Sequence, residues 1–378
     1  MLSWSLIVCT LDRPEVLEKC IAATLAQTRS ARQIIIVDAS HTWERNKKFI
    51  LESFASTAPE IEWIYVSSDQ KSLTYQRNIG LQYATSDVAF LLDDDSFMYP
   101  DCAEHVMRVY EADVAQRIGG VTTLLVEAPP DLLATNEVVE STSTSLSEPM
   151  KRPSLMQWLK QKAEGLWYIE QLFIPYDGHY HTYDTGSFNS RFPIFNEVLF
   201  HGCRMTFRTA AVLEVGGFNE ALIRAAIAED SDISYRVSRK YALVLTEQAK
   251  LFHAHTPIAR MKRFPNAVLR FLNITALFIL NSTCKTPTSV LIYRYFLTRV
   301  LLEFIRDCTK PQHGFPNFRG GLYAMPIAIK MLGMTQQELR SWYPIFQAEF
   351  LDRHKKQSSR VERVKQAGDS VTSADSTH

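Results

Sequence analysis

Residues 87–96 read DVAFLLDDDS, a short apolar run that ends in three consecutive aspartates. Its length, its apolar character and its polar boundaries predict a buried β-strand. Four more runs of this kind alternate with segments whose apolar residues have helical spacing, namely WSLIVCT at 4–10, QIIIVDAS at 33–40, IEWIYVSS at 61–68 and GGVTTLLVEA at 119–128. Because strands alternate with helices, the sequence predicts an α/β fold with a mostly parallel sheet flanked by helices.

The composition narrows the class of protein. The chain carries 41 basic and 41 acidic side chains, and this zero formal charge argues against a protein that binds nucleic acid. Its six cysteines are scattered without a CxxC pair, which is typical of reduced thiols in a reducing compartment. The start, MLSWSLIVCT, has no feature of a secretory signal. We therefore expect a cytoplasmic location.

Shifts in composition also divide the chain. We expect one α/β domain over residues 1–255, a helical extension over 256–355 and a disordered polar tail over 356–378. Residues 127–165 are rich in Ser, Thr, Pro and Glu and predict a long mobile insert within the first domain. The most apolar stretch of the extension, from Phe271, is shorter than the roughly 20 residues that a membrane-spanning helix needs, so no such helix is expected.

Acidic residues follow three of the expected strands. They are Asp12 after the first strand, Asp38 at the end of the second, and Asp93, Asp94 and Asp95 at the end of the fourth. Ligands of open α/β sheets bind at the carboxyl ends of the strands. Aspartate is also common in chain reversals, so a purely structural role stays open for Asp12 and Asp38. Three consecutive carboxylates are harder to explain as a turn and predict a positively charged partner.

A hard divalent cation is the expected partner of this triplet. Mg²⁺ and Mn²⁺ prefer oxygen ligands, and proteins commonly hold them with one or two carboxylates together with substrate phosphates. Asp93 and Asp95 face the same side if the strand stays extended beyond Leu92. His253, in the block FHAHTP, is a further candidate for a contact with metal or phosphate, with a structural role as the alternative. These residues predict a site for a metal ion and a diphosphate.

Two further blocks carry candidate site residues. In AEDSDISYRV, Glu229 and Asp230 stand where a helix is expected to begin. Acidic residues there can simply cap the helix, but beside a metal–diphosphate site one of them becomes a candidate general base. Arg77, in SLTYQRNIG, is a candidate phosphate ligand, although ordinary surface charge is the alternative. The chain has neither GxxxxGK[ST] nor GxGxxG at a strand-to-helix turn, which argues against a kinase or a dinucleotide-dependent dehydrogenase.

These blocks, in this order, resemble the family 2 glycosyltransferases, which are inverting enzymes of the GT-A fold that use nucleotide-sugar donors. The resemblance runs from about Ser5 to His255 and rests on IVCTLDRPEVLEKCIAA, IIIVDAS, QRNIGLQYATSDVAFLLDDDS, HGCRMTFRTAAVLEVGGFNE and AEDSDISYRV. Two features depart from the family pattern. The second strand ends in DAS instead of the commoner double acid with glycine, and Cys203 and Arg204 stand where an asparagine is more usual.

The resemblance implies a role for each matching residue. It makes Asp230 the catalytic base, with Glu229 beside it helping to place the acceptor. It makes Asp95 the main ligand of a Mn²⁺ or Mg²⁺ ion, with Asp93 and His253 as further ligands. The residues that it places at the nucleotide sugar are Thr10, Asp12, Asp38, Arg77, Asp93 and Asp94.

The function that this resemblance implies is metal-dependent transfer of a hexosyl or related sugar, with inversion, from a nucleotide-diphosphate donor. UDP is the expected nucleotide, and a glycan or lipid-linked hydroxyl in surface polysaccharide or glycolipid synthesis is the expected acceptor. One alternative is a non-catalytic protein that binds nucleotide sugars. Another is a metal-dependent phosphatase that uses the DxD motif, but its motif would lie on the first strand, whereas here three strands precede it.

The expected helical extension has its own charge pattern. Residues 256–310 hold nine Lys or Arg residues but only two acids, Glu303 and Asp307. Interleaved with apolar runs, this excess predicts peripheral contact with the anionic inner face of a membrane. The alternative is a basic helical subdomain whose charges simply face water.

Overall fold

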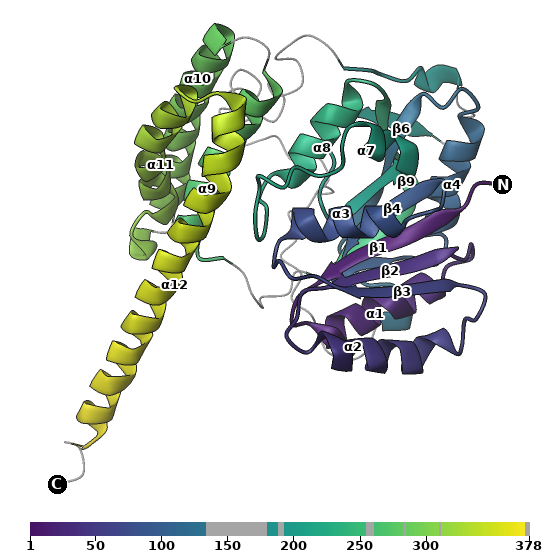
Figure 1. Cartoon of the computed structure of the whole chain (residues 1–378), viewed down its shortest axis with the longest axis horizontal. Coiled ribbons are helices and arrows are strands. Elements are labelled where there is room, and N and C mark those ends of the chain that lie inside the picture. Colours follow the sequence, from purple (N-terminus) through teal and green to yellow (C-terminus); the bar gives the residue numbers. More distant parts are fainter. Residues whose placement is uncertain (134–179, 188–192, 255–260, 283–284, 310, 375–378) are drawn as a thin grey trace. The chain divides into compact units, whose positions relative to one another are not determined.

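The structure is a computed structural model that describes residues 1–133, 180–187, 193–254, 261–282, 285–309 and 311–374 (Figure 1). The chain divides into two compact units, Met1–Ala259 and Arg260–His378. The first is an α/β unit and the second is helical. Of the predicted insert 127–165, only residues 127–133 are described, and they include one short 3-10 turn, η2 (Asp131–Leu133). The remainder of that insert lies outside the described residues.

The α/β unit contains the predicted alternation of strands and helices. Its strands are β1 (Trp4–Thr10), β2 (Gln33–Asp38), β3 (Glu62–Ser67), β4 (Val88–Asp93), β5 (Ser96–Met98), β6 (Ile118–Val126), β7 (Ile194–Glu197), β8 (Arg204–Arg208) and β9 (Ala242–His253). Its helices are α1 (Pro14–Leu25), α2 (Trp43–Ile50), α3 (Leu73–Tyr83), α4 (Cys102–Ala112), α7 (Thr209–Glu214) and α8 (Glu229–Ser238), with a π-helical turn, η1 (Leu51–Ala55), after α2 and a 3-10 turn, η4 (Thr185–Ser187).

The strands form one nine-stranded sheet in the order β3-β2-β1-β4-β8-β6-β9-β5, with β7 paired to β9 (Figure 1). The first four strands in this order run parallel, as the sequence predicts. The other half of the sheet is mixed, because β8 runs antiparallel to β4 and β6, and both β5 and β7 run antiparallel to β9. The predicted α/β class is therefore confirmed, with a mixed sheet in place of a mostly parallel one.

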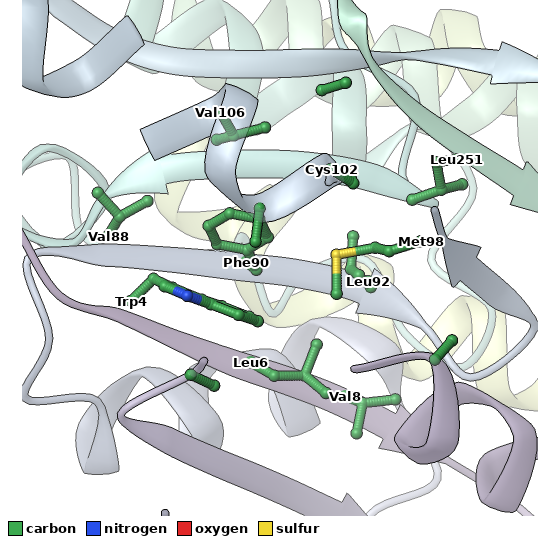
Figure 2. Close-up of a cluster of buried hydrophobic side chains, with 14 of the residues drawn as sticks. Trp4, Leu6, Val8, Val88, Phe90, Leu92, Met98, Cys102, Val106 and Leu251 are labelled. Atoms are coloured by element: carbon green, nitrogen blue, oxygen red, sulfur yellow. The ribbon is translucent and has the colours of Figure 1, made fainter. Parts of the chain in front are cut away.

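Apolar side chains on both faces of the sheet form the core. Along β1, Leu6 and Val8 join the cluster that packs against α1 and α4, whereas Ile7 and Cys9 join the cluster under α3, α7 and α8. Successive side chains of a strand point to opposite faces, so a strand covered on both sides reads as one continuous apolar run. Figure 2 shows the first cluster, in which Trp4 of β1 lies beside Phe90 of β4, with 4.5 Å between ring centroids.

The second unit consists of the helices α9 (Arg263–Asn281), α10 (Lys285–Cys308), α11 (Pro316–Leu332) and α12 (Gln336–Ala374), with a 3-10 turn, η5 (Pro311–His313), before α11. The sequence shows helical patterns at 266–282, 288–307 and 335–350, and these lie in α9, α10 and the start of α12. Helix α12 continues to Ala374, where the polar sequence predicts a disordered tail from residue 356. Its Lys, Arg, Glu and Gln residues are good helix formers, which explains the difference.

Helix α11 is absent from the sequence prediction because its Gly320–Gly321 pair and its internal Pro326 look like helix breakers. The structure explains the glycines by close packing, since α11 lies against α9. A Cβ atom added at Gly320 would lie 2.7 Å from the Cβ of Ala267 on α9. Tertiary contact therefore favours glycine at this position despite its low helix propensity.

Within the described part of the chain, α9 alone is long and apolar enough to cross a membrane. Of its apolar window, 72% is buried inside the protein. A buried core helix passes the same test of length and composition, so this helix is weak evidence for a membrane span.

Close contact between α3 and β1 gives a test of the fold. A Cβ added at Gly80 of α3 would lie 2.3 Å from Cγ2 of Ile7, a fully buried side chain of β1. We expect Gly80→Ala to lower the free energy of unfolding by about 1–3 kcal/mol, because the helix or Ile7 must shift. Denaturant unfolding measures this. Gly333→Ala is the control, because its nearest neighbour would be 3.4 Å away, and equal stability of the two variants would contradict the packing.

Candidate functional site

The acidic triplet lies at the carboxyl end of β4, in the middle of the sheet. Asp93 is the last residue of β4 and pairs in register with Cys9 of β1. After a turn at Asp94 and Asp95, the chain enters β5, whose Ser96 lies opposite His253 of β9. The antiparallel pairing of β5 with β9 thus brings His253 to the triplet across 158 positions of sequence.

Asp93, Asp95 and His253 form a cluster that could hold a metal ion. One ligand atom from each residue lies within 4.8 Å of the others. His253 Nε2 is 3.0 Å from Oδ1 of Asp95. Burial by itself lowers the pKa of His253, but hydrogen bonding to Asp95 and Cys203 outweighs it and raises that pKa to about 10. Two carboxylates and one imidazole are a donor set that suits a divalent ion such as Mn²⁺.

Asp94 points the other way and is fully buried. Its carboxylate accepts a 2.7 Å hydrogen bond from Thr10 Oγ1 and forms an ion pair with Arg13. Burial raises the pKa of Asp94 to about 7, and Arg13 opposes that rise. The triplet therefore divides, with Asp93 and Asp95 on the cluster side and Asp94 anchored to β1 and to the start of α1. A turn at Asp94 and Asp95 produces this division, where the sequence predicts an extended strand. Thr10 and Asp94, both predicted at the nucleotide sugar, bond to each other.

Arg13 is a site residue that the sequence reasoning missed. It directly precedes α1 and also donates to Oδ2 of Asp95 at 3.2 Å, with 21% of its side chain exposed. The available signal was its place in LDRPE, directly after the first strand, at the same sheet edge as the triplet.

Arg77 joins the two acidic groups of the site. Its guanidinium is 1% exposed and lies 2.9 Å from Oδ1 of Asp93 and 2.9 Å from Oε1 of Glu229. It also donates to the carbonyl of Gly202 at 2.9 Å. Burial tends to lower the pKa of Arg77, but the two carboxylates raise it overall, so the side chain stays charged. The predicted contact between Arg77 and a phosphate stays a prediction.

Glu229 and Asp230 begin α8, after Ala228 in a left-handed conformation. Burial and the neighbouring Asp230 raise the pKa of Glu229 to about 8. Asp230 stays partly exposed, and its carboxylate accepts hydrogen bonds from the backbone N–H groups of Ser231 at 2.7 Å and Gly202 at 3.1 Å. Burial raises its pKa, which favours a carboxylate that can accept a proton.

Gly202 is a second residue that the sequence reasoning missed. Its N–H binds Asp230 and its carbonyl binds Arg77, so one peptide segment holds both. A Cβ atom here would lie 2.7 Å from Oε1 of Glu229. In the sequence, the only indication of this role was the position of Gly202 in the block HGC, residues 201–203.

Asp38, the last residue of β2, is held by neighbouring groups, and its predicted contact with a donor base stays a prediction. It is fully buried, and its oxygens accept hydrogen bonds from the Ser40 N–H, the Asn46 amide and the Tyr65 hydroxyl. These bonds tie β2 to α2 and β3. Asp12 keeps a position at the sheet edge, in a left-handed turn (φ 55°) where its N–H donates to Ser40 Oγ at 2.7 Å.

Comparisons with known proteins agree with the sequence resemblance. Residues 5–143 match the model of the family described as glycosyl transferase family 2. A glucosyl-dolichyl phosphate glucuronosyltransferase from Haloferax volcanii is 26% identical over 119 residues, which are 31% of this chain and 37% of that protein. The match therefore spans little more than a third of the relative's length.

Three solved structures share a distant overall similarity. A mannosyltransferase, PcManGT from Pyrobaculum calidifontis, in complex with GDP-Man and Mn²⁺, is 12% identical with a TM-score of 0.48, over 92% of this chain and 86% of that one. GalNAc-T7 with UDP, GalNAc and Mn²⁺ is 12% identical with a TM-score of 0.48, over 88% of this chain and 58% of that one. TarS from S. aureus is 10% identical with a TM-score of 0.43, over 78% of this chain and 44% of that one.

Similarity at this level carries no argument about site or substrate. The family match and the sheet flanked by helices agree with the predicted GT-A fold. Over residues 5–143 the chain is therefore similar to glycosyl transferase family 2.

Proposed function

We propose that the protein is a metal-dependent glycosyltransferase that moves a sugar from a nucleotide-diphosphate donor to an acceptor hydroxyl with inversion. One observation carries this proposal: a single buried guanidinium, that of Arg77, binds both Asp93 of the metal-ligand cluster and Glu229 beside Asp230. The two acidic groups that the reaction needs, one for a metal and one for a proton, therefore adjoin one another.

In this proposal Asp93, Asp95 and His253 hold a Mn²⁺ or Mg²⁺ ion. A divalent cation bound there supplies Lewis-acid stabilisation of the negative charge on the departing diphosphate. Asp94 takes no part in binding the ion, because it is buried against Thr10 and Arg13. Its role is to fix the turn that presents its two neighbours.

Asp230 acts as the general base. It removes the proton of the acceptor hydroxyl while that oxygen forms a bond to the anomeric carbon and the bond from this carbon to the diphosphate oxygen breaks. The N–H groups of Gly202 and Ser231 hold the carboxylate in place. Glu229 is a positioning residue, because it is buried and bound to Arg77.

For the nucleotide we propose UDP, bound at the carboxyl ends of β1 and β2, where the Asp12 N–H donates to Ser40 Oγ. Asp38 stabilises this part of the chain by accepting a hydrogen bond from the Ser40 N–H. For the acceptor we propose a glycan or lipid-linked hydroxyl in surface polysaccharide or glycolipid synthesis. The name of the Haloferax relative, which refers to a dolichyl phosphate, supports a lipid-linked acceptor. The free cysteines of the described residues support a cytoplasmic location.

A phosphatase mechanism fits the site less well. A DxD phosphatase carries its motif on the first strand, whereas the triplet here ends β4, after three other strands of the chain. A non-catalytic nucleotide-sugar-binding protein would not release free nucleoside diphosphate. Incubating the protein with a panel of nucleotide sugars, with and without Mn²⁺, tests the proposal. Release of nucleoside diphosphate that requires Mn²⁺ supports it, and binding without turnover contradicts it.

Removing the base should separate chemistry from binding. We expect Asp230→Asn to lower turnover by about 10²–10⁴-fold, because no carboxylate then takes the proton from the hydroxyl of the acceptor. Donor affinity should stay near that of the wild type, since the hydrogen bonds of Asp230 are to Gly202 and Ser231 and not to the metal-ligand cluster. Steady-state kinetics and donor titration measure the two effects. Asp101→Asn, an exposed acid outside the site, is the control, and wild-type turnover in Asp230→Asn would refute the assignment.

Removing a metal ligand should instead affect donor binding. Asp95→Asn takes one carboxylate from the cluster, and we expect Mn²⁺-dependent donor affinity to fall at least about tenfold. Affinity measured without metal should change little. Calorimetric titration of UDP in the presence and absence of Mn²⁺ makes the comparison. If Asp95→Asn retained the full Mn²⁺ effect, the cluster would not be the metal site.

The link through Arg77 gives a third prediction. Arg77→Met leaves Asp93 and Glu229 with unpaired, largely buried charge and should cost about 3–5 kcal/mol of stability. Arg77→Lys keeps the charge but loses the two-pronged contact, so we expect a nearly normal melting temperature with kcat reduced at least about tenfold. Arg236→Lys, on the same helix as Glu229 and paired with Asp232, is the control. A normal kcat in Arg77→Lys would show that Arg77 is only structural.

A further inference from the structure

Helix α10 of the second unit (Figure 1) exposes an unusual set of side chains. Between Ser289 and Ile305, every exposed position carries a large apolar residue, each with 41–71% of its surface accessible. Phe304 packs on Phe315 and Phe318 within the unit. We call the other five residues the α10 apolar face: Val290, Tyr293, Leu297, Leu301 and Ile305. Their steps of three and four residues place them on one side of the helix.

The opposite side of α10 is also apolar, but it is used inside the unit. Tyr295 and Phe296 are buried and pack on Phe271 of α9, with ring centroids 5.5 and 5.1 Å apart. This side therefore accounts for the stability of the helix in its unit. The α10 apolar face has no such role, and a contiguous apolar surface of this kind usually marks a contact site.

The charges of α10 indicate which partner covers the face. The two acids of the helix, Glu303 and Asp307, are buried. Glu303 lies 3.1 Å from Arg299, and Asp307 accepts hydrogen bonds from Asn317 and from the backbone N–H of Phe318. Arg294, by contrast, is half-buried and lies four residues after Val290 and three before Leu297, on the side of the apolar face. Arg306 is exposed on the other side of the helix, 3.7 Å from Glu303.

The charge beside the face is therefore positive. From Ser289 to Cys308, α10 carries Arg294, Arg299 and Arg306 and exposes no carboxylate. A surface that combines large apolar side chains with cations, and exposes no carboxylate of its own helix, complements a layer of anionic headgroups over acyl chains. A second copy of the chain would instead bring like charges together.

We propose that the α10 apolar face inserts into the headgroup region of an anionic membrane and holds the protein at the membrane surface. The apolar side chains enter the boundary between headgroups and acyl chains, and the neighbouring cations contact lipid phosphates. This proposal concerns a surface of the second unit and does not depend on the reaction assigned to the first.

Sedimentation of the full chain with lipid vesicles tests the proposal. We expect binding to vesicles of phosphatidylcholine with phosphatidylglycerol, weaker binding to phosphatidylcholine alone, and a loss of this difference at high salt. Leu297→Ser combined with Leu301→Ser should lower the partition coefficient at least about tenfold. The matched control is Val114→Ser combined with Leu213→Ser, two exposed apolar residues of the α/β unit, which should bind as the wild type does.

Three results would overturn the proposal. The first is a wild type that sediments with neither kind of vesicle. The second is a wild-type dimer, measured by light scattering, that the serine substitutions convert to monomers. The third is a loss of thermal stability in the serine variant, as expected for a face buried within the protein. Mn²⁺-dependent donor hydrolysis in solution should be equal in the wild type and the serine variant. A missing vesicle contact and a missing transferase activity are thus distinguishable.

Discussion

The buried ion pairs of Arg77 are the interaction on which the site depends. A guanidinium removed from water is stable only with charged partners, and Arg77 has two, Asp93 and Glu229. The ring of Phe218 covers it, with 5.2 Å between its central carbon and the ring centroid. Because these partners come from β4 and α8, the arginine fixes the distance between the candidate metal cluster and the proposed base, Asp230.

The mixed sheet explains why residues so far apart in sequence meet. Parallel pairing of β1 with β4 sets Thr10 close to Asp94, and antiparallel pairing of β5 with β9 brings His253 to Asp95. The antiparallel strand β8, next to β4, begins just after Gly202, which binds both Arg77 and Asp230. Each pairing delivers one part of the site, so a shift of register in β5 or β8 would separate the ligand cluster from the base.

The sequence predicts the parts of the site that follow from local pattern. The alternation of strands with helices gives the α/β class, and Asp93 and Asp95 lie together as predicted, although a turn and not an extended strand brings them there. The sequence does not predict features that depend on residues distant along the chain. The burial of Asp38 depends on Asn46 and Tyr65, and the mixed half of the sheet depends on long-range strand pairing. Arg77 looks like a surface residue of a helix until β4 and α8 are seen to enclose it.

The central claim is that Asp93, Asp95 and His253 hold a divalent cation that also binds the diphosphate of the donor. Anomalous X-ray diffraction from crystals grown with Mn²⁺ and UDP tests it most directly. The account predicts one strong manganese peak within bonding distance of all three side chains and of the diphosphate oxygens. A bound UDP whose diphosphate lies away from these residues, or a manganese ion held elsewhere, would contradict it.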